Sequence, residues 1–323
     1  MSKTFDILVI GGGINGAGIV RDASGRNLKV CLVEKNTVGS ATSSWSTKLI
    51  HGGLRYLENY EFRLVRESLK EREVIKKIAS DITTQMPFII PHQKTQRPKW
   101  LIKLGLFLYD HLGGKMTISK SSTINIQKEI PDILKDQFKV GFQYYDLQVD
   151  DKKLVQLNIQ DSKKKGATII ENTKVINVKR DKNEWSIYLD NNSLIKAKVL
   201  INASGPWIND VLSKVIKIDA KKSIRLVKGS HIITKRLYHQ KKAFTLQNED
   251  NRIVFVIPYK EKYSLIGTTE TEVFSPENPK IDEKEINYLI STVNKYFVKQ
   301  LSKDEVISSY SGIRPLIENF KEA

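Results

Sequence analysis

Three glycines near the N-terminus have the spacing of a phosphate-binding turn. Gly11, Gly13 and Gly16 follow an apolar run at 5–10 and open a helical pattern at 14–27. In such a turn the first glycine allows a tight bend, the second lets a pyrophosphate approach the backbone, and the third allows close helix–strand packing. The helix N-terminus also offers unpaired N–H groups to the phosphates. The pattern predicts that a dinucleotide binds here.

Glu34 ends the second apolar run, 18 residues after Gly16. A carboxylate at this place can accept hydrogen bonds from ribose hydroxyls, and it would repel a 2′-phosphate, which disfavours NADP. The motif does not by itself choose between NAD and FAD.

The elements that must position these residues follow from the hydrophobic periodicity. Residues 5–10, 14–27 and 29–33 predict a β-strand, an α-helix and a second β-strand, followed by a polar loop at 36–48. Further helices are expected at 61–79, 150–165 and 281–301, and further strands at 168–170, 175–178, 185–189, 198–201, 253–257 and 264–267. In the first of these helices, one side is expected to carry Phe62, Val65, Leu69, Val74, Ile75 and Ile78. Residues 81–120 are rich in proline and basic side chains, and we expect them to be irregular.

Composition restricts the class of partner. The chain has 53 Lys and Arg against 36 Asp and Glu, a net charge of +17, which favours anionic partners such as phosphorylated metabolites, nucleic acid or an anionic membrane. Its single cysteine, Cys31, lies in an apolar run, where a small buried strand residue is expected. The chain begins without a signal-peptide pattern and contains no apolar run long enough to span a bilayer, so we expect a cytoplasmic protein.

A resemblance to a known family rests on motifs that occur in the family's order along the chain. The segment 41–57, Ala-Thr-Ser-Ser-Trp-Ser-Thr-Lys-Leu-Ile-His-Gly-Gly-Leu-Arg-Tyr-Leu, resembles the flavin loop of FAD-dependent glycerol-3-phosphate dehydrogenases and is called the flavin loop below. Similar matches lie at 60–65, 105–113, 202–207, 228–231, 246–250, 252–258, 266–269 and 310–315.

The resemblance implies an α/β fold, in which a Rossmann-like FAD-binding domain of the glutathione-reductase and D-amino-acid-oxidase type is interleaved with a mixed α+β substrate domain. We assign 1–80 and 141–215 to the FAD-binding domain, 81–140 to an insertion that contacts the membrane, 216–305 to the substrate domain, and 306–323 to an incomplete return to the FAD-binding domain. The family pattern continues beyond 310–315, so we expect the chain to lack the end of its flavin domain.

The resemblance also implies a reaction: oxidation of sn-glycerol 3-phosphate to dihydroxyacetone phosphate, with electrons passed to a membrane quinone. The cofactor would be noncovalent FAD, and the protein would lie peripherally on the inner face of the cytoplasmic membrane. No metal and no nucleic acid are expected as partners, and a homodimer is one candidate for the assembly.

Five residues are expected in the catalytic pocket by similarity to the family. Arg55, Tyr56 and Arg314 would line the substrate site, where an arginine fork suits a phosphate. His231 is the candidate base, because an ordinary imidazole titrates near pH 6.5. Thr269 ends a strand beside a glycine and is expected near the substrate.

The cofactor is expected to contact residues at three places: the glycine turn with Glu34, the flavin loop, and the small-residue turn after residue 202. These residues are Gly11, Gly13, Ile14, Asn15, Gly16, Glu34, Lys35, Thr42, Ser43, Ser46, Lys48, Leu49, His51, Gly52, Gly53, Ala203, Ser204, Gly205 and Trp207.

A segment at 94–109 has the composition of a membrane-surface patch. Its basic residues, Lys94, Arg97, Lys99 and Lys103, flank the apolar runs 100–102 and 104–109. Cations attract anionic lipid while aromatic side chains enter the interface. An ordinary core segment capped by solvated lysines is the alternative interpretation.

Two other functions remain open at this point. One is an FAD-dependent amine or amino-acid oxidase, which would share the glycine turn and Glu34. The other is a noncatalytic flavoprotein fragment.

Overall fold

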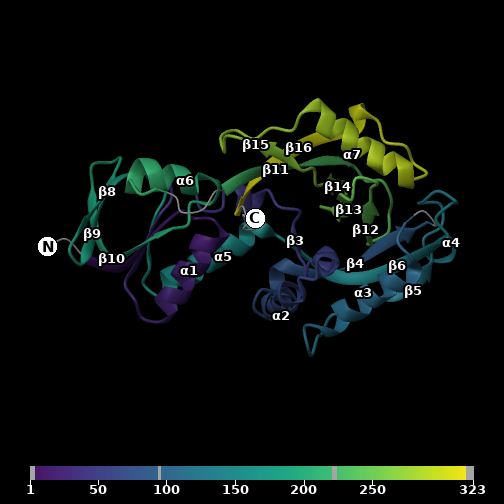
Figure 1. Ribbon diagram of the computed structural model, residues 1–323, viewed down its shortest axis with the longest axis horizontal. Coiled ribbons are helices and arrows are strands. Elements are labelled where there is room, and N and C mark those ends of the chain that lie inside the picture. The colour runs from purple at the N-terminus through teal and green to yellow at the C-terminus, as the bar shows by residue number, and fades with distance from the viewer. Residues whose placement is uncertain (1–3, 94–95, 220–223, 318–323) are drawn as a thin grey trace, which may run out of the picture.

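The computed structural model describes residues 4–93, 96–219 and 224–317. Two β-sheets form two lobes that lie side by side along the long axis of the molecule (Figure 1). The chain passes between the lobes several times, so each sheet is built from distant segments.

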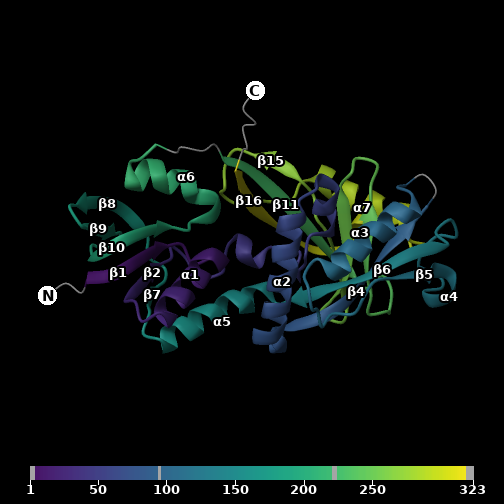
Figure 2. The ribbon, with the colours of Figure 1, turned by 60° about the horizontal axis from the view of Figure 1, so that its bottom comes forward.

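The first lobe is a six-stranded sheet in the order β7-β2-β1-β10-β9-β8. Its strands are β1 (Thr4–Ile10), β2 (Val30–Val33), β7 (Thr168–Ile170), β8 (Val175–Asp181), β9 (Glu184–Leu189) and β10 (Leu194–Asn202). β7, β2, β1 and β10 are parallel, and β9 and β8 extend the sheet as an antiparallel meander. The helices α1 (Ile14–Gly25) and α5 (Asp151–Lys164) pack together against one face, as Figure 2 shows.

The opposite face of this sheet contacts a short helical pair, α6 (Ile208–Asp210) and η5 (Val211–Ile216). Cys31 is fully buried in this layer, and burial raises the pKa of its thiol to about 12. The predicted role of Cys31 as a small buried strand residue is therefore confirmed.

The second lobe is a ten-stranded sheet with a central path β15-β11-β14-β13-β12-β4-β6-β3, in which β16 also pairs with β11 and β5 with β6. The strands are β3 (Leu49–Ile50), β4 (Thr83–His92), β5 (Ser122–Asn125), β6 (Val140–Val149), β11 (Ile224–Lys235), β12 (Ala243–Gln247), β13 (Ile253–Tyr259), β14 (Tyr263–Gly267), β15 (Thr271–Val273) and β16 (Val306–Ile317).

Helices cover both faces of the second sheet. The helix α7 (Glu283–Tyr296) packs on one face, where it buries Leu289 and Val293. On the other face lie η2 (Leu54–Asn59), α2 (Phe62–Ile78) and α3 (Lys99–His111), whose inner side chains share a core with β4 and β6. Figure 1 shows α7 and the pair α2 and α3 on opposite sides of the sheet. Short segments η1 (Thr42–Ser44), η3 (Ser80–Ile82), α4 (Ile126–Glu129), η4 (Gly205–Trp207) and η6 (Lys303–Glu305) complete the described elements.

Two expectations about local structure are wrong. Residues 81–120 are not irregular, because they contain β4 and α3. Proline is tolerated in β4 because β12 pairs with only two of its residues, so most of that edge needs no N–H donors. The apolar side predicted for α2 is only partly buried: Phe62, Val74 and Ile78 are 40–55% exposed, whereas the charged Arg72 is 2% exposed.

The sheets also divide the chain differently from the predicted domain ranges. β3 and β6 belong to the second sheet, whereas the ranges 1–80 and 141–215, predicted for the FAD-binding domain, contain β3 and nearly all of β6. β16 pairs along β11 in the second sheet. The alternation of apolar residues identifies a strand but does not identify its partner, so the assignment of strands to sheets could not be read from the sequence.

Candidate active site

The glycine turn has the backbone geometry that its spacing predicts. Gly11 has φ +106°, and a Cβ there would lie 2.5 Å from the carbonyl oxygen of Ala203. A Cβ on Gly16 would lie 1.9 Å from the carbonyl oxygen of Gly11. No larger residue fits at either position. The turn therefore brings the start of α1 close to the ends of β1 and β10.

The N-terminus of α1 faces the flavin loop. Gly13 is the N-cap, and the backbone N–H of Ile14 donates to Ser43 Oγ at 2.9 Å. Glu34 accepts hydrogen bonds from the backbone N–H groups of Gly12 at 2.7 Å and of Asn36 at 2.9 Å. A carboxylate from β2 and a hydroxyl from the flavin loop thus meet at the glycine turn.

A cavity of about 320 Å³ opens beside this turn. It is lined by predicted cofactor residues from all three places, namely Gly11, Gly13, Glu34, Lys35, Thr42, Ser43, Ala203, Ser204, Gly205 and Trp207. Sequence reasoning missed other lining residues, among them Asn36, Thr173, Lys174, Asp210, Lys214 and Glu277. Thr173 and Lys174 follow β7, and β7 lies next to β2 in the parallel sheet. Ligands bind at the carboxyl ends of such strands, so this signal was available once the strand order was known.

The remaining predicted cofactor residues do not line this cavity. Asn15 and Gly16 lie in the first turn of α1, after Ile14. Ser46 and Lys48 both bind Asp151 at the start of α5, through Ser46 Oγ at 2.7 Å and Lys48 Nζ at 2.7 Å. Leu49 belongs to β3, and His51, Gly52 and Gly53 lead from β3 into η2.

The residues around the cavity fit a dinucleotide. The turn excludes side chains at Gly11 and Gly16, the start of α1 supplies backbone N–H donors, and the acidic Glu34 stands at the end of β2. A pyrophosphate at the helix N-terminus and a ribose beside the carboxylate would satisfy these groups.

From the cavity, the flavin loop runs along β16 and β11 of the second sheet. Thr42 Oγ1 donates to the carbonyl of Ile313 at 2.8 Å, and the Tyr310 hydroxyl donates to the carbonyl of Ser46 at 2.8 Å. Thr47 Oγ1 lies 3.0 Å from His231 Nε2. The loop therefore connects the cavity in the first lobe to the centre of the second sheet.

His231 is enclosed on β11, with 2% of its surface exposed. Its ring stacks on Tyr310 at 4.8 Å between centroids, and a Cβ on Gly267 would lie 2.2 Å from its Cδ2. Burial, together with the positive charges of Lys48 and Arg314, lowers the pKa of His231 to about 3. The imidazole is therefore neutral at pH 7. Its Nδ1 is buried and has no hydrogen-bond partner among the described residues.

The predicted catalytic residues fall into separate groups. Arg314 on β16 pairs with Val227 of β11, the strand that carries His231, and its Nη2 is 3.5 Å from Glu270 Oε1. Arg55 and Tyr56 lie on η2, and Tyr56 is 45% exposed. Arg55 lines a second cavity of about 860 Å³ together with Arg252.

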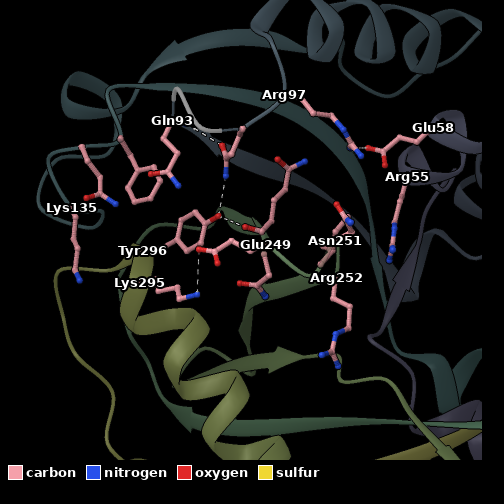
Figure 3. Close-up of a pocket in the computed structure, with 16 residues that line it drawn as sticks. Arg55, Glu58, Gln93, Arg97, Lys135, Glu249, Asn251, Arg252, Lys295 and Tyr296 are labelled. Atoms are coloured by element: carbon pink, nitrogen blue, oxygen red, sulfur yellow. Dashed lines mark hydrogen bonds and ion pairs between the residues drawn. The ribbon is translucent and has the colours of Figure 1, made fainter.

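Figure 3 shows this second cavity, with Arg55 and Arg97 on one side and Lys135, Lys295 and Tyr296 on the other. Arg97 is paired with Glu58, whereas no ion pair joins Arg55 to a described carboxylate. His231 and Arg314 do not line this cavity, so the structure does not gather Arg55, His231 and Arg314 around one cavity.

Thr269 is buried and hydrogen-bonded to other protein groups in this conformation. It is 1% exposed, and its hydroxyl donates to Glu285 Oε1 at 2.6 Å and accepts from the backbone N–H of Ser230 at 3.0 Å. Lys228 Nζ contacts the other oxygen of Glu285 at 2.9 Å. The Lys-Gly-Ser-His motif thus contributes one buried ion pair toward α7 and presents His231 toward the flavin loop.

The fold and the glycine turn define a two-lobed dinucleotide-binding protein of the α/β class. A family model described as FAD dependent oxidoreductase matches residues 6–321, and the chain belongs to this family. The predicted fold class and the predicted cofactor, FAD, agree with this assignment.

Two of the relatives that match this chain are dehydrogenases named for phosphorylated polyols. The chain is 46% identical to the aerobic glycerol-3-phosphate dehydrogenase of Escherichia coli (strain K12), over 98% of this chain and 64% of that protein. It is 45% identical to D-erythritol 1-phosphate dehydrogenase of Brucella abortus (strain 2308), over 99% of this chain and 65% of that protein. The chain thus spans somewhat less than two thirds of the length of these relatives.

Solved structures show the same fold. Glycerol-3-phosphate dehydrogenase from Bacillus halodurans, complexed with FAD, matches with a TM-score of 0.77 at 28% identity, over 98% of this chain and 58% of that chain. Glycine oxidase from Bacillus cereus ATCC 14579 matches with a TM-score of 0.70 at 18% identity, over 97% of this chain and 84% of that chain, which shows the fold alone.

Proposed function

We propose that this chain binds FAD noncovalently in the cavity beside the glycine turn and serves in the oxidation of sn-glycerol 3-phosphate to dihydroxyacetone phosphate. The observation that carries the proposal is the joint placement of the glycine turn, Glu34 and Ser43 around one cavity, in a chain 46% identical to a glycerol-3-phosphate dehydrogenase.

Each group of residues has a role in this proposal. Gly11, Gly13 and the first turn of α1 would hold the pyrophosphate, and Glu34 would bind the ribose. Bound FAD supplies a two-electron acceptor for the hydride that leaves the substrate carbinol carbon. Arg314 and Arg55 each offer a guanidinium fork for the phosphate.

His231 is the proposed acceptor of the proton from the substrate hydroxyl. With its pKa lowered to about 3, the imidazole is a weak base in this conformation, so the proposed role requires the pKa to rise. The negative phosphate of a bound substrate would raise it by offsetting the charges of Lys48 and Arg314. Thr47 is hydrogen-bonded to Nε2 of His231 and would fix the orientation of the ring.

Anaerobic reduction of bound flavin tests the substrate. Glycerol 3-phosphate should bleach the flavin absorbance of the purified protein, while glycine and sarcosine should not. Bleaching by the amines alone would favour the oxidase interpretation. A yellow protein that no substrate reduces would favour a noncatalytic flavoprotein.

A second substrate has specific support from the relative that acts on D-erythritol 1-phosphate. Both named substrates are phosphorylated polyols, so the proposal extends to this class. Comparing the rates of bleaching by glycerol 3-phosphate and erythritol 1-phosphate under the same conditions decides which substrate is preferred.

We further propose that α3 contacts an anionic membrane and that electrons pass to a quinone there. Its outer side exposes Trp100 by 67%, Leu104 by 47% and Phe107 by 58%, while Leu106 and Tyr109 face inward. Lys99 and Lys103 are exposed beside them, and Lys94 lies outside the described residues. Among the described helices none is long and apolar enough to span a bilayer.

Vesicle flotation tests this surface. The Trp100→Ser/Phe107→Ser variant should lose binding to anionic vesicles. Phe274→Ser is the matched control, because Phe274 is fully exposed on the loop after β15. Equal binding of wild type to anionic and neutral vesicles, or equal loss in both variants, contradicts the proposed surface.

A further inference from the structure

A buried hydroxyl connects α3 to the flavin loop. Tyr109 lies on the inner side of α3 with 1% of its surface exposed. The backbone N–H of Gly52 donates to the Tyr109 hydroxyl at 2.7 Å, and that hydroxyl donates to Asp146 Oδ1 on β6 at 2.8 Å. Tyr109 does not line the cofactor cavity.

The direction of these hydrogen bonds follows from the chemistry of a buried phenol. Burial and the adjacent Asp146 carboxylate hold the pKa of Tyr109 well above its usual range, so the hydroxyl keeps its proton. The proton is directed to Asp146, which leaves an oxygen lone pair for the N–H of Gly52. Phenylalanine at this position could make neither hydrogen bond.

Arg72 fixes the carboxylate that orients Tyr109. Its Nη1 lies 2.6 Å from Asp146 Oδ1 and also donates to the carbonyl of Tyr145 at 2.9 Å. Arg72 is 2% exposed, and Asp146 is 3% exposed. A buried ion pair of this kind keeps its geometry because breaking it would leave a charge uncompensated.

The backbone at Gly52 is also confined by packing. A Cβ on Gly52 would lie 2.3 Å from Leu69 Cδ2 and 2.9 Å from Tyr109 Cε2. Gly53, the next residue, has φ +72° and precedes η2, which carries Arg55. The hydrogen bond to Tyr109 therefore holds the flavin loop at the point where it turns toward Arg55.

We propose that Tyr109 is a positioning residue, which holds the backbone of Gly52 through Asp146 and Arg72 in the conformation that receives the ring end of FAD. This inference rests on the proposed function, because Gly52 is expected to contact the flavin ring only if FAD binds as proposed. A preformed loop loses less conformational entropy on binding than a mobile one. Loss of the hydrogen bond between Tyr109 and Gly52 should therefore weaken the binding of FAD.

Tyr144→Phe provides a matched control for Tyr109→Phe. Tyr144 is 3% exposed, lies in the same core with its ring 6.0 Å from that of Tyr109, and hydrogen-bonds only Thr245 Oγ1, at 2.9 Å, among the described residues. Both variants delete one buried hydroxyl, but only Tyr109→Phe releases Gly52. Melting temperature and the Kd for FAD, from quenching of flavin fluorescence, are measured for both.

We expect both variants to lose thermal stability, but only Tyr109→Phe to raise the Kd for FAD, by about tenfold, the scale of one buried hydrogen bond lost. Equal changes in Kd for the two variants would overturn the inference. Failure of the wild type to bind FAD would instead contradict the proposed function.

Hydrogen exchange of the wild type gives a test that does not depend on the folding of a variant. The peptide that contains Gly52 should exchange slowly in the FAD-free protein, because the anchor exists before the cofactor binds. Fast exchange that becomes slow only on addition of FAD would overturn the inference.

Discussion

The protonation state of one side chain affects both the chemistry and the stability of this protein. His231 stays neutral because it is buried and has cationic neighbours, with its pKa lowered to about 3. In the unfolded chain an imidazole titrates near 6.5. Between these two values the unfolded state binds more protons than the folded state, so stability rises with pH across this window and is lost as pH falls.

Replacing His231 should remove this pH dependence. Relative to His231→Gln, the wild type should lose about 2 kcal/mol of folding free energy between pH 7 and pH 5, since a one-proton difference gives about 1.4 kcal/mol per pH unit. Urea unfolding of both proteins at the two pH values measures the difference. Identical pH dependence would show that folding does not lower the pKa of His231.

The glycines of α1 allow a paired test of the phosphate turn. Gly16→Ala places a Cβ 1.9 Å from a backbone oxygen, so the turn must shift, and the affinity for FAD should fall by at least about 10-fold, or about 1.4 kcal/mol. Gly18→Ala, in the same helix, meets nothing within 4 Å and should leave FAD affinity unchanged. It should stabilise the helix by up to about 1 kcal/mol. Retained FAD binding by Gly16→Ala would place the cofactor elsewhere.

At the scale of elements, buried charges join the strands of the second sheet to the helices that cover it. Glu285 lies in the first turn of α7 and accepts hydrogen bonds from Thr269, Ser230 and Thr271, besides its ion pair with Lys228. Burial opposes the ionised form, but the hydrogen bonds from Thr269 and Lys228 lower the pKa of Glu285. The carboxylate therefore fixes α7 over β11.

Lys228→Met should destabilise the second lobe strongly, by about 3–5 kcal/mol, because it leaves the buried Glu285 charge without its partner. Lys295→Met, also on this lobe, breaks an exposed contact of 3.9 Å with Glu249 and should cost less than about 1 kcal/mol. Chemical denaturation followed by tryptophan fluorescence compares the two. Similar losses would mean that the Lys228 pair contributes no more than a surface contact.

Much of the element pattern was predictable from the sequence because it depends on local periodicity. The β-strand, helix and strand around the glycine turn, and the helices α2 and α5, were predicted within two residues of their observed ends. The helix predicted at 281–301 is shorter in the structure. Asp282 caps the start of α7, and the helix ends at Tyr296.

Long-range features were not predictable in this way. The burial of Arg72 depends on Asp146, 74 residues away, and the place of Glu277 in the cofactor cavity depends on a loop from the second lobe. Trp207 was expected at the cofactor, but its hydrogen bond to Glu277 and the position of Lys35 above its ring have no sequence signal. Such contacts depend on tertiary structure, whereas the glycine turn depends on backbone conformation and therefore appears as a motif.

For the whole molecule, the flavin loop contacts both lobes. It starts at the N-terminus of α1, hydrogen-bonds β16 and His231 of the second sheet, and ends at η2 beneath α3. The net charge of +17 suits both proposed anionic partners, a polyol phosphate and a lipid surface. The chain spans 62–65% of the length of four relatives at 43–47% identity.

The position of FAD in a crystal structure of the protein with the cofactor tests the account most directly. We predict electron density for the pyrophosphate at the N-terminus of α1, the ribose beside Glu34, and the flavin ring along residues 47–53 of the flavin loop near His231. A flavin ring far from His231, or a pyrophosphate that does not contact the glycine turn, would contradict the account.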